Sequence, residues 1–429
     1  MNVNGLVIAA PRSGSGKTTV SLGLLAALRG RGIAVAPAKS GPDYIDTAIL
    51  ARAARSEAVN LDAWAMPPAR LAALASRHAA GADLLLVEGA MGLFDGAADG
   101  GGSTADLAAA LGLPVLLVLD AERQSQSIAA LAHGFATWRP DVSVAGLIVN
   151  RAASARHEAM LRNALAALPI PLVGVIPKRD NLVLPERHLG LVLPGEVERF
   201  DAVVEAAAAA MGDYLDLNRL LALSSPLAAG AEAATLPPLG QHVAIARDAA
   251  FAFLYPHWLR DWHAAGATLT FFSPLADEPP DPGADAVFLP GGYPELHGPA
   301  LAAAGRFHAG LEAARDRGAL VYGECGGFMV LGRSITDRSG ATYPMSGLLP
   351  HETRIDRPRR VLGYRRLAHQ SPLPFPARLH GHEFHYSSAR RTHGTPLFAA
   401  TDALGDALPP MGLVEGRVMG SYAHVIDIA

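Results

Sequence analysis

The first stretch whose residue types and spacing could do chemistry is the run 11–19, Pro-Arg-Ser-Gly-Ser-Gly-Lys-Thr-Thr. It lies between a short apolar run and a helical pattern, the order of strand, glycine-rich loop and helix that a phosphate cradle requires. Backbone N–H groups of such a loop point at the ligand, the lysine can reach the outer phosphates, and the next threonine can bind Mg²⁺. Pro11 replaces the usual first glycine of the motif. We call this run the phosphate loop and predict a nucleotide site made by Ser13, Gly14, Ser15, Gly16, Lys17, Thr18 and Thr19.

The second stretch is Gly-Glu-Cys-Gly-Gly at 323–327, which holds the single cysteine of the chain. A cysteine between a strand and a helix, with glycines that tolerate a strained turn, is typical of a nucleophile elbow with sulfur in place of oxygen. We expect the helix N-terminus to lower the pKa of the Cys325 thiol. We expect His424, which lies near the end of a final strand-like run, to act as the base for this thiol. The alternative is that Cys325 is an inert, buried, small apolar residue.

Acidic residues follow two apolar runs of the first half. The run 33–38 leads into Asp43 and Asp46, and the run 84–87 leads into Glu88 and Asp95. Because open parallel sheets place their chemistry at the strand ends, we expect these side chains to share one rim with the phosphate loop. An acidic residue at such a strand tip is the usual second metal anchor, so we predict that Glu88 binds Mg²⁺ together with Thr18, with Asp95 behind Glu88 as a further ligand. The alternative for these carboxylates is a solvated or purely structural role.

Strand patterns alternate with helical patterns along both halves, which indicates doubly wound parallel sheets. In the first half, Asn150 lies at a strand tip and is predicted to contact the nucleotide. The segment 221–240 is rich in Ala, Ser, Pro and Gly, and we interpret it as a linker between domains at 1–220 and 241–429. The predicted strands are 5–10, 33–38, 84–87, 114–120, 144–150 and 172–177 in the first domain, and 242–246, 285–289 and 319–322 in the second.

Composition excludes several classes of protein. The 429 residues are 50% hydrophobic and 18% charged, with a net charge of −4, so there is no electrostatic case for binding nucleic acid. The N-terminus lacks the pattern of a signal peptide, and no apolar run reaches the roughly 18 residues of a membrane span. With one cysteine there is no internal disulfide framework. We expect a cytoplasmic protein that does not bind a membrane.

Two further patterns have open interpretations. The run 101–106, Gly-Gly-Ser-Thr-Ala-Asp, is either a functional loop or simply a capped helix start. His380, His382 and His385 have a spacing that could bind zinc, but the surrounding alternation fits a strand, and no cysteine supports a metal site.

The second half resembles a known glutaminase. Pro-Gly-Gly-Tyr-Pro-Glu at 290–295, the elbow at 323–327 and the late His424 are similar to class I glutamine amidotransferases, more narrowly to the branch found in cobalamin synthesis. This branch lacks the glutamate that other members carry two residues after the histidine, and here Ile426 stands at that position, followed by Asp427. What orients His424 is therefore open.

The first half resembles the dethiobiotin-synthetase-like P-loop fold, and the chain outside the linker resembles the a,c-diamide synthases of cobalamin biosynthesis. This resemblance implies an ATP-binding amidoligase domain and a glutaminase domain, which use ATP, Mg²⁺ and L-glutamine to amidate the a and c acetates of a corrinoid, cobyrinate or hydrogenobyrinate. It implies catalytic roles for Cys325, His424, Asp43, Tyr44 and Asp46. It also implies that Asp43 and Tyr44 face the corrinoid acetate and the metal, with Asp43 among the Mg²⁺ ligands. An acyl phosphate intermediate and internal passage of ammonia follow from the same resemblance, and a homodimer is a further expectation. The matching motifs are 39–46, 87–96, 187–190, 246–251 and 381–386.

Two alternatives stay open. A sister amidotransferase, either cobyric acid synthase or a nickel-sirohydrochlorin a,c-diamide synthase, would have the same two halves. A P-loop switch ATPase would use the first half alone, and Arg12 stands where such proteins carry a signature lysine. The glutaminase half would be useless to a switch. Hydrolysis of glutamine separates the switch ATPase from the amidotransferases.

Overall fold

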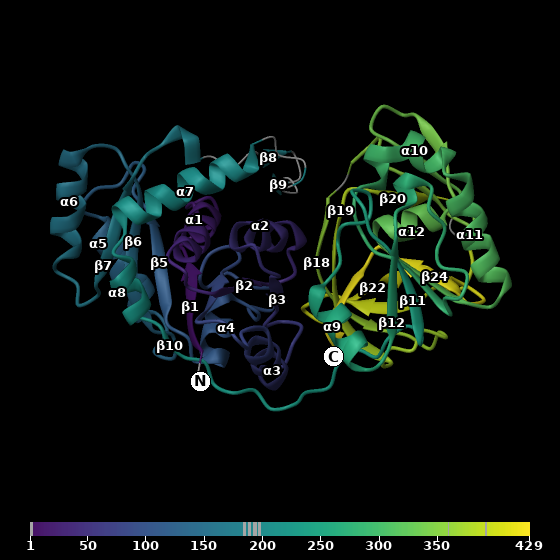
Figure 1. The fold of residues 1–429 in the computed structure, drawn as a ribbon, viewed down its shortest axis with the longest axis horizontal. Helices are drawn as coiled ribbons and strands as arrows, with labels where there is room; N and C mark the ends of the chain where they lie inside the picture. Colours follow the sequence, from purple (N-terminus) through teal and green to yellow (C-terminus); the bar gives the residue numbers. More distant parts are fainter. Residues whose placement is uncertain are drawn as a thin grey trace. The chain divides into compact units, whose positions relative to one another are not determined.

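The computed structural model describes residues 3–182, 186–187, 190–191, 195, 199–358, 360–390 and 393–429. The chain divides into two compact units, Met1–Ala233 and Ala234–Ala429 (Figure 1). His188 and Leu189, from the motif at 187–190, lie outside the described residues. Among the described residues, no helix has both the length and the apolar character needed to cross a bilayer.

The first unit is built on a parallel sheet in the order β3-β2-β4-β1-β5-β6-β7. Strands such as β4 and β5 are buried at every residue, which is why they appear in the sequence as continuous apolar runs. β1 lies in the middle of the sheet, so the phosphate loop that follows it leaves from the centre of one edge. The strands are β1 (Asn4–Ala9), β2 (Val35–Ser40), β3 (Val59–Leu61), β4 (Leu84–Glu88), β5 (Val115–Asp120), β6 (Val144–Ala152), β7 (Leu172–Pro177), the pair β8 (Glu186–Arg187) and β9 (Gly190–Leu191), and β10 (Ser225–Pro226).

Helices α1, α2 and α7 contribute to one continuous apolar core with the sheet, in which α1 packs against both of the others (Figure 1). α4 begins with a capping box, because the Ser103 hydroxyl accepts from the Asp106 N–H and the Asp106 carboxylate accepts from the Ser103 N–H. This supports the capped-helix interpretation of 101–106. The helices are α1 (Lys17–Gly30), α2 (Tyr44–Ala54), α3 (Pro68–His78), α4 (Thr104–Leu111), α5 (Ile128–Thr137), α6 (Ala155–Leu165), α7 (Phe200–Tyr214), α8 (Leu217–Ala222) and the 3-10 turn η1 (Asp180–Leu182).

Two details of the first unit differ from the predicted elements. The second strand begins at Val35 instead of residue 33 and includes Lys39 and Ser40, which were expected to follow it. The sequence analysis predicted no strand after 172–177 in the first domain, but Ser225 and Pro226 form β10, which pairs antiparallel with β1. The start of the segment interpreted as a linker thus belongs to the sheet of the first unit.

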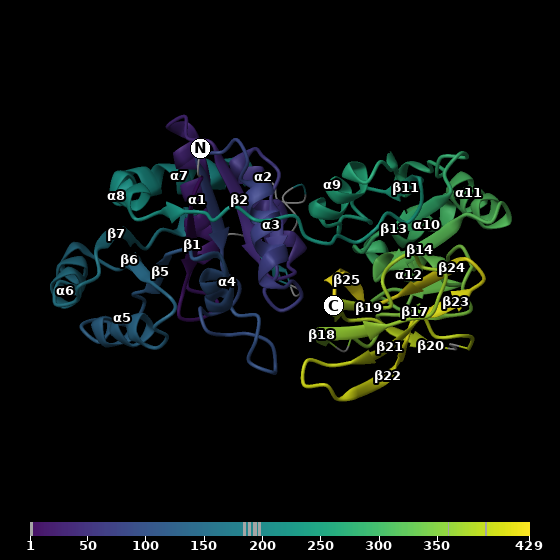
Figure 2. The same ribbon diagram turned by 90° about the horizontal axis from the view of Figure 1, so that it is seen from below.

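The second unit has a parallel sheet, β12-β11-β13-β14-β24, whose edge strand β23 is antiparallel. A separate antiparallel sheet, β22-β21-β18-β19-β25, lies on the other side of β13 and β14 from helix α9 (Figure 2). The strands are β11 (His242–Ala246), β12 (Thr268–Phe272), β13 (Ala286–Leu289), β14 (Leu320–Glu324), β15 (Ser334–Thr336), β16 (Thr342–Pro344), β17 (Glu352–Arg354), β18 (Val361–Ala368), β19 (Arg378–His385), β20 (Ser388–Arg390), β21 (Phe398–Thr401), β22 (Ala407–Met411), β23 (Leu413–Glu415), β24 (Val418–Ser421) and β25 (His424–Ile428).

The end of the chain corrects a second expectation. The sequence suggested that His424 lies near the end of one final strand, but this run forms two strands in two sheets. β24 ends at Ser421 in the parallel sheet, and His424 begins β25 in the antiparallel sheet. The helices of this unit are α9 (Pro256–Ala264), α10 (Gly298–Ala303), α11 (Gly305–Asp316), α12 (Gly326–Leu331) and the 3-10 turns η3 (Pro274–Ala276) and η4 (Pro294–His297).

Candidate active sites

The phosphate loop runs from β1 into helix α1, which begins at Lys17. Gly14 and Gly16 have φ angles of 78° and 88°, in the left-handed region that favours glycine. Contact also excludes a side chain at position 16, because a Cβ atom there would lie 2.2 Å from Nδ2 of Asn150. The same Asn150 amide donates to the carbonyl of Ser15 at 3.1 Å. The structure therefore brings Asn150 against the phosphate loop.

Strand register gathers the other residues at the same edge of the sheet. Glu88 ends β4 and lies opposite Ile8 of β1 on one side and Lys39 of β2 on the other. Asp120 ends β5 and lies opposite Asn150 of β6. Because these strands are parallel, their carboxyl ends and the phosphate loop meet at one rim, as the sequence led us to expect.

Lys39 is a site residue to which the sequence analysis gave no role. Its ammonium group is buried, 2.5 Å from Asp46 and 2.9 Å from Glu88. Burial alone would lower the pKa of Lys39, but the two carboxylates raise it above its usual value, so the group is charged. A lysine at the buried end of a strand was the available signal, since a buried ammonium requires acidic partners.

Glu88 fits the predicted role of a metal anchor. One carboxylate oxygen, Oε1, accepts from the Thr18 hydroxyl at 2.7 Å, while Oε2 is buried without a hydrogen-bond partner among the described residues. An unpaired buried carboxylate oxygen beside a threonine hydroxyl suits a hard cation such as Mg²⁺. No group of three His, Cys, Asp or Glu side chains in the described ranges could hold a metal. Any Mg²⁺ here would therefore depend on nucleotide oxygens and water as well.

Lys17 and Asp95 are both held by the loop that follows β4. Lys17 donates to the backbone carbonyl of Met91, and burial together with the charge of Lys39 lowers its pKa to about 8. Asp95 accepts from the backbone N–H of Gly92 at 2.9 Å, which closes a turn. The turn role is thus observed for Asp95, whereas its predicted metal role stays a prediction.

Asp43, Tyr44 and Asp46 lie at the start of α2. Asp43 is exposed and caps the helix, because its carboxylate accepts a hydrogen bond from the Asp46 N–H at 2.8 Å. Tyr44 is the first helical residue, and the Asp46 carboxylate is held by Lys39. Of the two acidic residues, Asp43 is the one that faces solvent.

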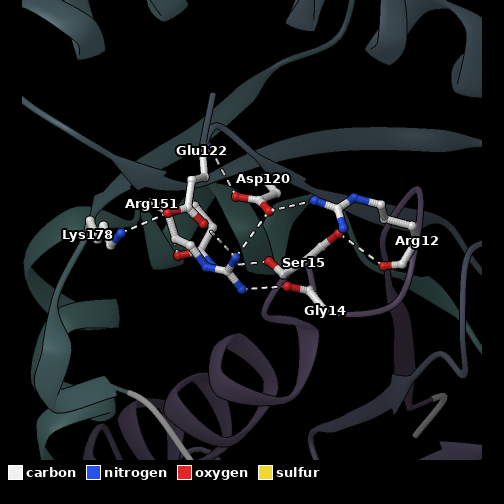
Figure 3. A network of polar contacts seen from close by, with 8 residues as sticks. Arg12, Gly14, Ser15, Asp120, Glu122, Arg151 and Lys178 are labelled. Atoms are coloured by element: carbon white, nitrogen blue, oxygen red, sulfur yellow. Dashed lines mark hydrogen bonds and ion pairs between the residues drawn. The ribbon is translucent and has the colours of Figure 1, made fainter. Parts of the chain in front are cut away.

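A network of charged side chains contacts the phosphate loop at Arg12 and Gly14 (Figure 3). Asp120 accepts from Arg12 at 3.2 Å and from Arg151 at 3.1 Å, and Arg151 also donates to the carbonyl of Gly14. Glu122 pairs with Lys178 at 2.8 Å and contacts Arg151 at 3.5 Å. Asp120 and Arg151 were missed by the sequence analysis, although both lie at the ends of predicted strands.

The nucleophile elbow is present in the second unit. Cys325 lies between β14 and α12 with a φ angle of 46° and a ψ angle of −104°, a strained conformation for a residue with a side chain. The glycines permit close packing, because a Cβ atom at Gly327 would lie 1.9 Å from the carbonyl oxygen of Leu289. One at Gly326 would lie 2.8 Å from Pro294.

The expected activation of the thiol by a helix N-terminus is wrong. Cys325 is 3% exposed, and burial together with the charge of Glu295 raises the pKa of its thiol well above the usual range. The backbone N–H of Gly326, at the start of helix α12, lowers the pKa of the thiol, but this contribution is smaller than the effect of burial. The resting thiol is therefore protonated, and the site depends on a base.

His424 is the candidate base, and it is enclosed by two residues. A Cβ atom at Gly291 would lie 2.3 Å from Cε1 of His424, so only glycine fits at this point of the motif at 290–295. On another side, His382 lies opposite His424 across β19 and β25 and stacks on it with ring centroids 4.9 Å apart. Nε2 of His382 lies 3.1 Å from the Tyr255 hydroxyl. These contacts place His382 against the candidate base His424.

The zinc alternative for the histidine cluster gains no support. His385 faces Glu383 at 3.3 Å and the carbonyl of Ser387 at 3.1 Å, whereas His382 belongs to the site of His424. In the portion of the chain that the structure describes, these side chains form no metal-binding group.

Glu295 interacts electrostatically with the Cys325 thiol, and the sequence analysis gave it no role of its own. It belongs to η4, which packs against α12 through Pro294 and Gly326. Its Oε2 atom is buried and has no hydrogen-bond partner among the described residues, and burial raises the pKa of Glu295 to about 7. The available signal was its place at the end of the Pro-Gly-Gly-Tyr-Pro-Glu motif.

Two family models match the two units. Residues 6–192 match the CobQ/CobB/MinD/ParA nucleotide binding domain, and residues 242–427 match the CobB/CobQ-like glutamine amidotransferase domain. Together with the two sites, these matches define a glutamine-dependent amidation enzyme of the ligase type, with nucleotide-binding and amidotransferase domains in one chain.

Full-length relatives narrow the class. A hydrogenobyrinate a,c-diamide synthase of Brucella anthropi is 53% identical over 99% of both chains, and one of Rhizobium meliloti is 51% identical over 100% of both. The chain belongs to the hydrogenobyrinate a,c-diamide synthase family. Among solved structures, a glutamine amidotransferase aligns at 18% identity and a TM-score of 0.30, covering 43% of this chain and 90% of that one. The family, fold class and enzyme class expected from the sequence are confirmed by the family models and the relatives.

Proposed function

We propose that this enzyme converts the a and c acetate groups of hydrogenobyrinate, a cobalt-free corrinoid, to amides, with ATP as co-substrate and glutamine as nitrogen donor. The observation that carries the proposal is the 53% identity, over 99% of both chains, to a relative that bears this activity as its name. Two sites with complementary chemistry in the same chain agree with it. A carboxylate does not react with ammonia at neutral pH, so it must first be activated, and ammonia must be supplied.

The phosphate loop and its rim suit the activation step. Mg²⁺, held by Thr18 and Glu88 with the nucleotide phosphates, would neutralise charge on the transferred phosphoryl group. Lys17 would exchange the carbonyl of Met91 for a phosphate oxygen, a favourable exchange because a charged acceptor strengthens the hydrogen bond. The product of this step is an acyl phosphate on the corrinoid acetate, with ADP released.

The start of α2 suits the acceptor side of the same reaction. Asp43 is exposed there, with Tyr44 next to it, and buried Lys39 lies behind them in contact with Asp46 and Glu88. A corrinoid carboxylate is repelled by Asp43 unless a cation lies between the two groups. We propose that the Lys39 ammonium and Mg²⁺ supply this positive charge, and that Asp43 and Tyr44 position the acetate.

The second site supplies the ammonia. His424 accepts the proton of Cys325, the sulfur attacks the amide carbon of glutamine, and the protonated histidine returns the proton to the departing ammonia. Water then cleaves the thioester to give glutamate and the free thiol. Ammonia displaces phosphate from the acyl phosphate and forms the amide, so each amidation consumes one ATP and one glutamine.

Product mass analysis tests this function. The enzyme is incubated with ATP, Mg²⁺ and glutamine in three separate reactions. Each reaction contains one acceptor: hydrogenobyrinate, cobyrinate or nickel sirohydrochlorin. We expect two successive replacements of OH by NH₂ on hydrogenobyrinate, with matching release of glutamate. Preferred amidation of one of the other acceptors would assign the chain to a sister activity, and absence of glutamine hydrolysis with every acceptor would refute the proposal.

A further inference from the structure

Glu324, the residue immediately before the nucleophile, is buried between the two strands that carry the glutaminase site. Its side chain is 1% exposed at the end of β14, where it lies opposite Ser421 of the parallel strand β24. One carboxylate oxygen, Oε1, accepts from the Tyr322 hydroxyl at 2.9 Å and from the backbone N–H of Val425 at 3.1 Å. The carboxylate is therefore fixed from two directions.

The second oxygen of Glu324 faces the histidine. Oε2 lies 3.7 Å from Nδ1 of His424, which is too long for a hydrogen bond but within the range of an ion pair. Both side chains are almost fully buried, so their charges are weakly screened. Contacts between catalytic groups are often longer without substrate and shorten when the substrate is bound.

We propose that Glu324 is the positioning residue of the glutaminase site and takes the place of the glutamate that this family lacks after its histidine. Its Oε2 accepts a hydrogen bond from the Nδ1–H of His424, which keeps the proton on Nδ1 and leaves Nε2 unprotonated and able to take the proton of Cys325. When that proton arrives, the carboxylate stabilises the imidazolium. This is the role of the third member of a catalytic triad, here supplied from the residue that precedes the nucleophile.

The surrounding groups are consistent with this assignment. His382 stacks on His424, but burial and the charges of His424 and Arg365 lower the pKa of His382 well below its usual value. A neutral His382 does not compete with His424 for positive charge. The N–H of Val425, directly after His424, donates to Glu324 and joins its carboxylate to the strand that carries the histidine.

Two substitutions at position 324 separate a positioning role from a structural one. Glu324→Gln keeps one oxygen for the Tyr322 hydroxyl and the Val425 N–H, but turns an NH₂ group toward Nδ1, which favours the wrong tautomer. Glu324→Asp keeps the carboxylate but shortens its reach. A positioning role predicts that the Asp variant is the more active glutaminase, whereas a structural acceptor role predicts that the Gln variant is.

The experiment measures glutamate release from glutamine by the full chain, together with the alkylation rate of its single cysteine by iodoacetamide. For Glu324→Gln we expect kcat to fall by about 10² to 10⁴, with KM for glutamine nearly unchanged and slower alkylation of Cys325. Asp285→Asn is the matched control, because Asp285 lies at the opposite end of the strands and accepts from the His242 N–H at 3.0 Å. It makes the same carboxylate-to-amide change, and we expect wild-type rates.

The relative glutaminase activities of the two variants decide between the two roles. An Asp variant more active than the Gln variant, both with the wild-type thermal unfolding profile, supports the proposal. A Gln variant that equals or exceeds the Asp variant, or that raises KM instead of lowering kcat, overturns it. The proposal rests on the glutaminase activity proposed above. If the wild-type protein releases no glutamate, that function fails and this inference fails with it, whereas an inverted order of the variants refutes only Glu324.

Discussion

At the scale of single residues, burial determines the protonation state of the candidate nucleophile, Cys325. Cys325 is a buried thiol that its own helix cannot ionise, so its reactivity depends on neighbours and on the arrival of glutamine. In the proposed function, the thiol takes part only in ammonia production, and the acyl phosphate forms at the phosphate loop.

Cys325→Ala should therefore abolish amidation driven by glutamine and leave amidation driven by added ammonium salts close to wild type. Free ammonia bypasses the thioester, and the change removes one sulfur atom from a site without altering the phosphate loop. Initial rates with each nitrogen source give the comparison. A folded variant that loses both activities would show that Cys325 is not a dedicated glutaminase nucleophile.

Glu88→Gln should weaken Mg²⁺ binding, so that both amidations need more Mg²⁺. The amide keeps an oxygen for the Thr18 hydroxyl but replaces the unpaired buried Oε2 with an NH₂ group, which does not bind a cation. We expect the Mg²⁺ concentration for half-maximal rate to rise at least about tenfold. Titration of the rate with MgCl₂ at saturating ATP measures it, and an unchanged midpoint would remove Glu88 from the metal site.

Glu295 should make the second unit less stable as pH rises. Its pKa in the folded chain is about 7, above the unfolded value, so the folded state holds a proton that the unfolded state loses. The stabilisation is complete below the unfolded pKa of about 4.3 and is lost as pH rises through about 7. Glu295→Gln lacks this dependence. We compare the free energy of unfolding of Glu295→Gln with that of wild type. Between about pH 5 and about pH 8 we expect this difference to shift in favour of the variant by about 1 to 3 kcal/mol.

Denaturant unfolding of both proteins at the two pH values tests this prediction, because contributions from the first unit cancel in the difference. A constant difference between the proteins would show that Glu295 is not protonated in the folded state.

At the scale of elements, the start of helix α2 combines a structural and a chemical role in one side chain. Asp43 caps the helix and also faces the proposed acceptor site. Parallel strands bring this helix start, the end of β4 and the phosphate loop to one rim, so a change in any of them reaches the same chemistry.

Two substitutions of Asp43 should separate these roles. Asp43→Asn keeps an oxygen for the Asp46 N–H, whereas Asp43→Ala loses the cap and should destabilise the protein by about 0.5 to 2 kcal/mol. Both variants should bind ATP nearly normally and form less diamide, with mono-amidated product accumulating. Calorimetry of ATP binding, product mass analysis and denaturant unfolding together test this. Loss of ATP affinity in Asp43→Asn as large as in Glu88→Gln would disprove the separate roles.

At the scale of the whole molecule, each unit contains its own buried core and its own site. The core of the first unit joins α1, α2 and α7 to the sheet, and that of the second surrounds Cys325 and α12. We therefore expect that a substitution at one site removes the activity proposed for that site and leaves the activity of the other site in place.

Lys17→Ala should remove ATP-dependent product with either nitrogen source, because no acyl phosphate forms. Removal of an arginine finger, which places one positive charge beside the transferred phosphoryl group, lowers the rate roughly 10³- to 10⁵-fold. We expect a loss of that scale when the positive charge of Lys17 is removed. Basal glutamine hydrolysis should persist, since the second site is unaltered. Near-normal synthesis from ammonia in this variant would show that the phosphate loop does not hold the reactive nucleotide.

The sequence by itself determined the parts of this protein that depend on local patterns. The phosphate loop and the elbow are each a strand, a glycine-rich turn and a helix, so neighbouring residues define them, and both occur as predicted. Buried parallel strands are equally easy to predict from sequence, because burial on both faces makes their residues continuously apolar. From these, the shared rim of Glu88, Lys17 and Asp43 could be expected before any coordinates.

Only the tertiary structure decided what surrounds the reacting groups. The ion pairs of Lys39 join residues up to 49 positions apart, and the contact of Glu324 with the strand of His424 spans 101 positions. Strand order, not local sequence, creates such contacts. The state of the Cys325 thiol is similar: its motif suggested a helix that lowers the pKa, but hydration lost to the whole surrounding core raises it. Burial and strand pairing are properties of the complete fold, and a motif does not contain them.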